Sequence, residues 1–110
     1  MARTSMELLH GTVSVLLLKT LSWNPMHGYD ISRSIRQLTD GALELEDAAL
    51  YQALHRLERK GWIEAEWGLS ENNRRAKFYR LTDEGRRALQ VEVSNWRRYV
   101  EAVFKVLETA

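Results

Sequence analysis

The chain has 110 residues, enough for one domain with a modest core but not for two independent ones. It contains no cysteine, which excludes disulfides and thiolate chemistry and suits the cytoplasm, and its longest apolar run, 15–18, is far too short to cross a membrane. The net charge is only +1, but acidic residues gather within 40–47 and basic residues within 74–80, and this segregation says more about partners than the total does.

The first predicted helix follows a capping box formed by Thr4 and Glu7 and runs to about Leu21. Its apolar residues cover more than one face, which indicates that the helix is buried on two sides. In so small a domain, we expect the second side to meet another chain.

The second predicted helix ends at the turn signal 39–41. Two starts are possible: Asn24 could cap it with Pro25 as its first residue, or it could begin one turn later at His27–Gly28. The segment after the turn, 42–46, alternates weakly and predicts a very short strand.

The stretch 46–62 predicts a helix whose two ends can both be recognised. Leu50, Leu54 and Leu57 form a narrow apolar stripe, Asp47 suits a cap or first turn, and Gly61 suits the position just past the helix. The opposite face has no acidic residue. It carries Ala48, Gln52, His55, Arg56 and Arg59, with Tyr51 on its flank. Such a face fits a DNA major groove, and a solvated surface helix is the alternative.

Two alternating segments, 62–67 and 76–82, predict strands joined by the polar loop 68–75. The stretch 72–80 has no acid and carries Arg74, Arg75, Lys77 and Arg80. Two strands joined in this way form a hairpin, here with a basic tip.

The last predicted helix opens with Thr82 as its cap and two acids in its first turn. Apolar residues then recur at alternating steps of four and three: Leu89, Val93, Trp96, Val100, Val103 and Leu107. A seam with this period needs a partner helix. We therefore expect a homodimer interface built on this seam, with a contribution from the first helix.

This order of elements predicts a mainly α (α+β) fold, a winged helix-turn-helix with a C-terminal dimerisation helix. We expect residues 1–82 to form the DNA-binding domain and residues 83–110 the dimerisation helix. The third helix would lie in the major groove, and the hairpin tip would reach phosphates or the adjacent minor groove. The start of the second helix, 27–29, could offer N–H groups to a phosphate.

Several segments resemble PadR-type transcriptional regulators: Leu-His-Gly-Thr at 9–12, Met-His-Gly-Tyr at 26–29, Leu-Tyr and Ala-Leu-His-Arg-Leu-Glu within 50–58, and Tyr-Arg-Leu-Thr at 79–82. The resemblance covers nearly the whole chain, and the single C-terminal helix is similar to the shorter subfamily. It implies a homodimeric repressor that a small effector releases from DNA. Some short members bind flat aromatic compounds between their two C-terminal helices, against a tryptophan. Here that residue would be Trp96, with Val100, Val103, Val15 and Leu18 as apolar walls.

The sequence departs from this family at the start of the third helix. Members usually carry Ser or Thr just before the Leu-Tyr pair, often with Gly before it and Pro after the pair, where this chain has Ala49, Ala48 and Gln52. The missing hydroxyl removes one phosphate contact or cap. We therefore expect the operator, or the affinity for it, to differ.

The candidate DNA-binding residues are His27, Gly28, Tyr29, Ala48, Ala49, Tyr51, Gln52, His55, Arg56, Asn73, Arg74, Arg75 and Lys77. Some have structural alternatives. The Tyr51 ring could pack on the second helix, and Trp96 could serve dimer packing alone. Trp23, Trp62 and Trp67 are interpreted as core and hairpin packing.

The sequence predicts a sequence-specific DNA-binding regulator, with double-stranded DNA, a second copy and a small aromatic effector as partners, and no membrane. No cofactor and no metal are expected, since the histidines are too scattered for a metal motif. An enzyme is not expected, because neither a Gly-rich phosphate loop nor a paired carboxylate–histidine arrangement occurs. The alternative is a winged-helix protein–protein module that does not bind DNA. A neutral or acidic wing would favour it, but Arg74 and Arg75 argue against it.

Overall fold

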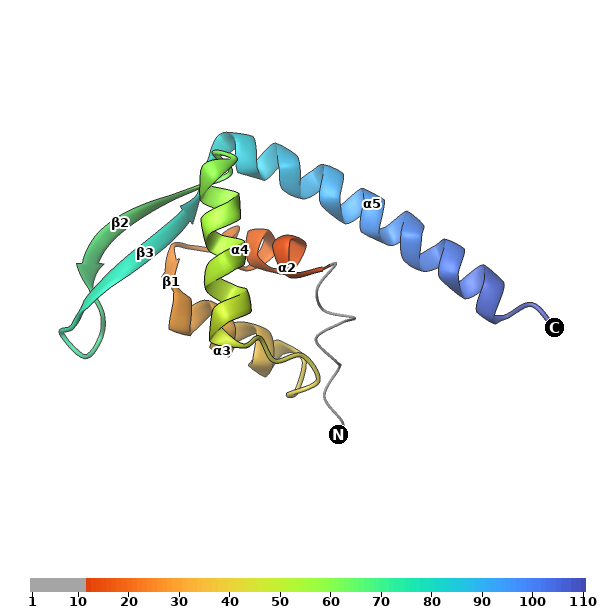
Figure 1. Ribbon diagram of the computed structural model, residues 1–110, viewed down its shortest axis with the longest axis horizontal. Helices are drawn as coiled ribbons and strands as arrows, with labels where there is room; N and C mark the ends of the chain where they lie inside the picture. The colour runs from red at the N-terminus through yellow and green to blue at the C-terminus, as the bar shows by residue number, and fades with distance from the viewer. Residues whose placement is uncertain (1–11) are drawn as a thin grey trace.

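The computed structural model describes residues 12–110, so the predicted capping box at Thr4 and Glu7 lies outside the described residues (Figure 1). Within that range, four helices pack around a three-stranded antiparallel sheet of order β1-β3-β2. The elements are α2 (Val13–Leu21), β1 (Met26–His27), α3 (Gly28–Leu38), α4 (Asp47–Arg59), β2 (Ile63–Leu69), β3 (Arg75–Leu81) and α5 (Asp83–Leu107). This arrangement confirms the predicted winged helix-turn-helix with a long helix after the wing.

Helix α2 is the centre of the fold, because α3, α4, α5 and β3 all pack against it. Val13, Leu17, Leu18 and Leu21 are buried by these elements of the same chain. The expectation that the second apolar side meets another chain is therefore wrong for these residues. Leu18 has no exposed surface and belongs to the core, so it cannot be a wall of an effector site between subunits. Val15 is only partly buried.

Helix α3 begins at the later of the two predicted starts. His27 caps it, since its Nδ1 atom accepts a hydrogen bond from the Asp30 N–H at 3.3 Å. The short strand lies at Met26–His27, where Met26 pairs with Tyr79 of β3. The predicted strand at 42–46 is wrong. The sheet takes its third strand from Met26–His27, and residues 42–46 adopt no strand conformation.

Helix α4 buries Leu50, Ala53, Leu54 and Leu57, as its apolar stripe predicts. It ends at Gly61, which has a φ of +78°, a value that favours glycine. The Gly61 N–H donates to the Glu58 carbonyl at 3.0 Å, and the next N–H donates to the carbonyl of residue 57 at 3.1 Å. The predicted role of Gly61 is confirmed.

The wing is the hairpin of β2 and β3. Ile63 pairs with Leu81 at its base and Leu69 with Arg75 near its tip, so the strands extend further than predicted and the loop is shorter. Asn73 adopts the left-handed conformation in the tip, with a φ of 57°, which asparagine tolerates better than most residues.

Helix α5 is joined to the wing and α4 at a tight corner. Thr82 caps it, as predicted, by accepting from the Gly85 N–H at 3.0 Å. The Thr82 N–H donates to the Trp62 carbonyl at 3.0 Å, and Gly85 lies against the same carbonyl. A Cβ on Gly85 would lie 2.0 Å from that oxygen, so only glycine allows this approach.

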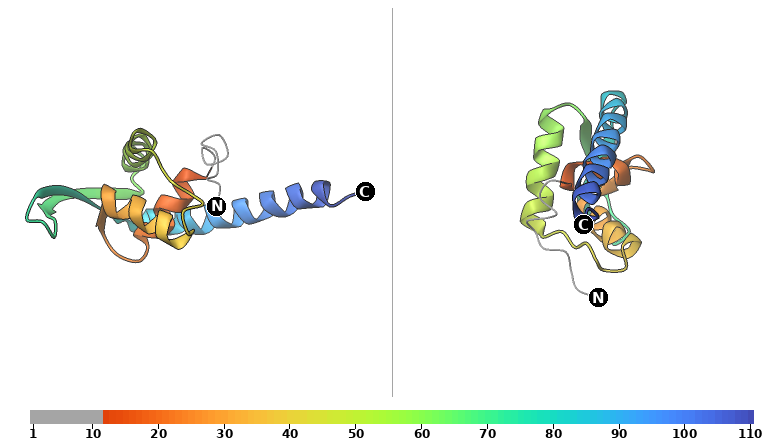
Figure 2. Two further views of the ribbon diagram at one scale, coloured as in Figure 1. Left: turned by 90° about the horizontal axis from the view of Figure 1, so that it is seen from below. Right: turned by 90° about the vertical axis from the view of Figure 1, so that its right-hand side faces the viewer.

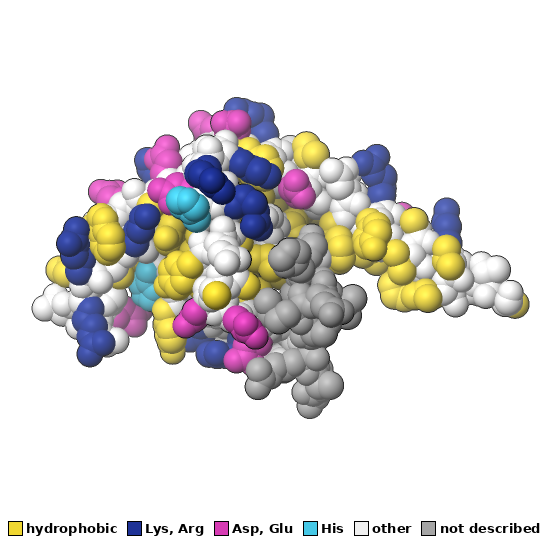
Figure 3. Space-filling view, in the orientation of Figure 1, with side chains coloured by type: hydrophobic (Ala, Val, Ile, Leu, Met, Phe, Trp, Pro, Cys, Tyr) yellow, Lys and Arg dark blue, Asp and Glu magenta, His cyan; other side chains and the backbone are white. Residues whose placement is uncertain are grey.

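Beyond this corner, α5 leaves the body of the molecule (Figures 1 and 2). Leu89 still packs against the core, but from Ser94 onward every residue is exposed except the half-buried Val100. Hydrophobic side chains gather along this free part of the helix (Figure 3). No helix within 12–110 has both the length and the apolar character needed to cross a bilayer.

Candidate nucleic-acid interface

The outer face of α4 lies on the front of the molecule in Figures 1 and 3, and Ala48, Gln52, His55 and Arg59 are all exposed on it. Acidic side chains gather where the helix begins, and basic ones over its C-terminal half (Figure 3). The acids suit the helix dipole, but they would repel phosphates. Phosphate contacts should therefore come from the turns of α4 beyond the first and from neighbouring elements.

Two predicted residues of α4 lie at the margin of this face. Arg56 is turned toward α2, where its Nη2 atom donates to the Ser14 hydroxyl at 3.2 Å. Ala49 is partly buried. Ala48, Gln52 and His55 thus form the central exposed row of this face, with the exposed Arg56 and the partly buried Ala49 at its margin.

Tyr51 joins α4 to the start of α3. A Cβ on Gly28 would lie 2.6 Å from the Tyr51 hydroxyl oxygen, so the tyrosine packs directly on this glycine. Gly28 is buried, and the surface here is formed by Tyr51 and Tyr29, which are both exposed. Gly28 was predicted as a DNA contact. Its role is instead structural, because the absence of a side chain at Gly28 lets the Tyr51 ring pack directly on α3.

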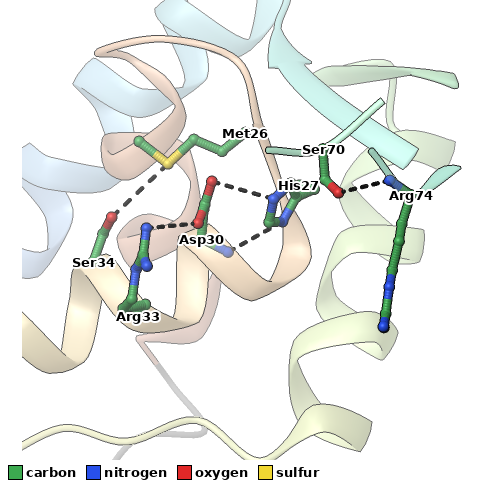
Figure 4. Close-up of polar contacts among 7 residues, drawn as sticks. All are labelled: Met26, His27, Asp30, Arg33, Ser34, Ser70 and Arg74. Carbon is green, nitrogen blue, oxygen red and sulfur yellow. Dashed lines mark hydrogen bonds and ion pairs between the residues drawn. The ribbon is translucent and has the colours of Figure 1, made fainter. Parts of the chain in front are cut away.

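A small polar network fixes the first turn of α3 (Figure 4). Asp30 lies 3.3 Å from His27 Nε2 and accepts from Arg33 Nη2 at 2.9 Å. The His27 ring also meets Phe78 of β3 edge-on, with ring centroids 5.3 Å apart. These contacts hold His27 as a structural cap beside the candidate interface, and they bring to it Arg33, which sequence reasoning missed.

The two faces of the wing carry different chemistry. Directly paired residues point to the same side of an antiparallel sheet. One face therefore holds Ile63, Ala65, Trp67, Leu69, Arg75, Lys77, Tyr79 and Leu81, and the other holds Glu64, Glu66, Phe78 and Arg80. Near the base of the hairpin the first face packs against the core. Toward the tip the same face is exposed to solvent. This part of the face carries cations without a carboxylate.

The cations of the wing are not equivalent. Arg80, on the outer face, forms an ion pair with Glu64 at 2.6 Å. Lys77 lies 3.6 Å from Glu58 of α4, so it partly serves to join the wing to that helix. Arg74 is exposed at the tip, where its N–H donates to the Ser70 hydroxyl at 3.3 Å (Figure 4). The tip thus presents Arg74 beside the exposed Asn73.

Tyr79 lies behind these cations. Burial, and to a lesser degree the nearby Glu58 carboxylate, raises the pKa of its phenol above the ordinary value. The folded protein therefore favours the neutral form of the Tyr79 phenol.

An open groove of about 930 Å³ runs between the wing, the start of α3 and α4. It brings together several predicted residues from four elements, namely His27, Tyr29, Tyr51, Arg75 and Lys77. It is also lined by Trp67, which sequence reasoning assigned to hairpin packing. Trp67 is 57 % exposed, so it is not a core residue, although Arg75 of the neighbouring strand does pack over its ring. The alternation in 62–67 placed Trp67 on the face of Ile63 but could not show that this face leaves the core.

The arrangement suits a nucleic acid, with a helix face for a groove and a cationic hairpin beside it. Within residues 12–110, no group of three His, Asp or Glu side chains could hold a metal ion.

The family model described as "Transcriptional regulator PadR-like family" matches residues 17–91. The fold is similar to that of a transcriptional regulator from Clostridium thermocellum, with 30 % identity, 90 % of this chain and 96 % of that chain covered, and a TM-score of 0.82. A PadR family transcriptional regulator from Eggerthella lenta is 35 % identical, with 96 % and 89 % covered and a TM-score of 0.79. One from Clostridium difficile is 27 % identical, with 86 % and 97 % covered and a TM-score of 0.73.

Proposed function

The chain belongs to the PadR-like family of transcriptional regulators, and from that premise we propose that it is a homodimeric repressor that binds one specific DNA operator. Proteins of this family are regulators and not enzymes. One observation carries the proposal: the exposed, acid-free row of Ala48, Gln52 and His55 on α4 lies beside a groove lined by wing cations. A regulator that reads base edges needs such a row, and it needs phosphate contacts on one side of it to fix the register.

The proposed contacts divide by chemistry. The Gln52 amide can pair with the edge of an adenine, and the Ala48 methyl can meet a thymine methyl. His55 and the Tyr51 hydroxyl can donate hydrogen bonds to the phosphates that flank the DNA major groove. Asn73, Arg74 and Arg75 of the wing would contact the backbone or the adjacent minor groove.

The proposed dimer rests on the free part of α5. Trp96 is 40 % and Val103 36 % exposed in the single chain, and Leu107 is more exposed still. A solitary helix with such a row of apolar side chains has too little packing to be stable in water. A second copy of the same helix would cover the row. In this proposal, residues 1–82 bind DNA, residues 83–110 hold the dimer together, and Val15 contributes from α2.

The proposed effector is a planar aromatic molecule between the two copies of α5. Trp96 lies mid-seam with Tyr99 beside it, their ring centroids 5.6 Å apart. Two symmetry-related indoles could sandwich such a molecule, with Val100 and Val103 as walls, and each aromatic pair would gain about 0.5–1.5 kcal/mol. Coupling would be reciprocal, so a ligand that weakens DNA binding is itself bound more weakly on DNA.

Selection of bound duplexes from a random DNA pool tests the central claim. The expected result is a pseudo-palindrome with half-sites about 34 Å apart, or a multiple of that spacing. Recovery of no enriched sequence would contradict the proposal and would favour the protein–protein module. The effector is tested separately by titrating planar aromatics against tryptophan fluorescence, in wild type and in Trp96→Ala. Binding that does not depend on Trp96 would make this residue dimer packing alone.

A further inference from the structure

An exposed tryptophan on the wing is the feature that the proposed function leaves unexplained. Trp67 is 57 % exposed although Ala65, two residues nearer the core on the same strand face, is partly buried. A large apolar side chain left in water gives up the free energy of burial. Its exposed surface faces the groove that also contains Tyr51 and Lys77.

The sheet register decides which way this tryptophan points. Trp67 pairs with Lys77, and Leu69 pairs with Arg75, so these four side chains share one face of the wing. The carboxylates of Glu64 and Glu66 lie on the opposite face. Of the two faces of the wing, the one with Trp67 is thus the more favourable for a polyanion. Two carboxylates from outside these strands also line the groove, Glu71 and Asp30, and Asp30 is paired with Arg33.

Arg75 lies over the Trp67 indole, with its guanidinium carbon 4.3 Å from the ring centroid. A guanidinium that stacks on an aromatic ring can still donate hydrogen bonds, because its N–H groups point outward in the plane of the guanidinium. The other two cations on these strands are held by carboxylates, Lys77 by Glu58 and Arg80 by Glu64. Within residues 12–110 Arg75 forms no ion pair. Its guanidinium instead contacts the Trp67 indole.

We propose that Trp67 is a DNA-contacting residue that also positions Arg75: the guanidinium binds a backbone phosphate while the indole packs on the deoxyribose beside it. This inference rests on the proposed function, since it requires DNA in the groove. It assigns to the wing a grip on the sugar-phosphate backbone that does not depend on sequence. A lysine at 75 could not reproduce it, because an ammonium cannot stack and present a planar fork.

The test measures the affinity for the selected operator and for a random duplex at several salt concentrations. The variants are Trp67→Ala, Arg75→Ala, the double variant and Trp67→Phe. Trp23→Ala is the matched control, because Trp23 is 52 % exposed and has Lys19 over its ring at 5.8 Å, but does not line the groove.

We expect Trp67→Ala and Arg75→Ala each to weaken binding to both duplexes by about fivefold to tenfold. Each should also make the slope of log K against log salt shallower by about 1.8, because one phosphate contact, worth about 0.9, is lost in each half of the dimer. The double variant should bind no more than about twofold more weakly than Trp67→Ala, since removing the indole already releases Arg75. Trp67→Phe should retain part of the affinity, and Trp23→Ala should match wild type.

Two results would overturn the proposal. Trp67→Ala that binds as Trp23→Ala does would show that the indole is not in the interface. Effects that multiply in the double variant would show that Trp67 does not position Arg75. A wild-type protein that binds no duplex at all would instead overturn the proposed function itself, and this inference with it. Circular dichroism of each variant checks that the wing is still folded.

Discussion

Replacing Gly85 by alanine tests the corner where α5 joins the rest of the chain. The added Cβ would lie 2.0 Å from the Trp62 carbonyl oxygen and 2.8 Å from Leu81 Cδ1. A carbon atom approaches a carbonyl oxygen to about 3.3 Å, so the first turn of α5 must move by about 1 Å. That shift strains two hydrogen bonds of Thr82, one donated to the Trp62 carbonyl and one accepted from the Gly85 N–H.

The cost can be assembled from these contacts. Overpacking costs about 1–3 kcal/mol. The two weakened hydrogen bonds cost about 1 kcal/mol each. The better helix propensity of alanine returns about 0.5–1 kcal/mol. We expect a net loss of about 2–4 kcal/mol, which lowers Tm by about 8–16 °C for a domain of this size.

Thermal unfolding followed by circular dichroism, at one fixed protein concentration, measures this loss. Gly41→Ala is the control, because a Cβ there meets nothing within 4 Å and only the φ of +82° opposes it. That strain costs about 1–2 kcal/mol. A Gly85→Ala variant that melts no lower than Gly41→Ala would refute the tight corner between α5 and Trp62.

Three further predictions concern the dimer, pH and DNA recognition. Val100→Glu places a charge in the apolar seam of α5, so it should sediment as a monomer or an unfolded chain at micromolar concentration. The control Ser94→Glu should remain dimeric. A folded dimer of Val100→Glu would contradict the proposed seam. Because the pKa of Tyr79 is raised in the folded protein, stability should be complete below its ordinary value of 10.0 and fall as pH rises through the folded pKa. Tyr79→Phe should reduce this alkaline loss in denaturant titrations, and Tyr99→Phe, on the exposed part of α5, should not. Gln52→Ala should change which sequences are bound, while Arg74→Ala should weaken binding to all sequences and flatten the salt dependence; the same effect of both on every sequence would remove this division of roles.

The parts of the fold that depend on local chemistry could be predicted from the sequence. The cap at Thr82, the glycine that ends α4 and the leucine stripe of α4 are each set by residues within one or two turns. The start of α3 left two alternatives because Asn24 and His27 are both acceptable caps. Only the pairing of Met26 with Tyr79 decides between them.

The parts that depend on distant partners could not be predicted. A strand of two residues is too short for any alternation to reveal, so the sequence placed it in 42–46 instead of at Met26–His27. Leu18 belonged to an apolar run that looked two-sided, and only the packing around α2 shows that the same chain buries it. Trp67 shared a pattern with Ile63, but whether a strand face is inside or outside depends on where the core ends.

The corner at Gly85 makes α5 a lever with its pivot at one end. A helix of 25 residues is about 37 Å long, so a tilt of about 10° at its base carries its far end through about 6 Å. The base of α5 is fastened by a backbone hydrogen bond from Thr82 to Trp62, which lies three residues after the end of α4. If the C-terminal parts of two copies of α5 are held against each other, a small change in the angle at which they cross would therefore reorient the two copies of α4.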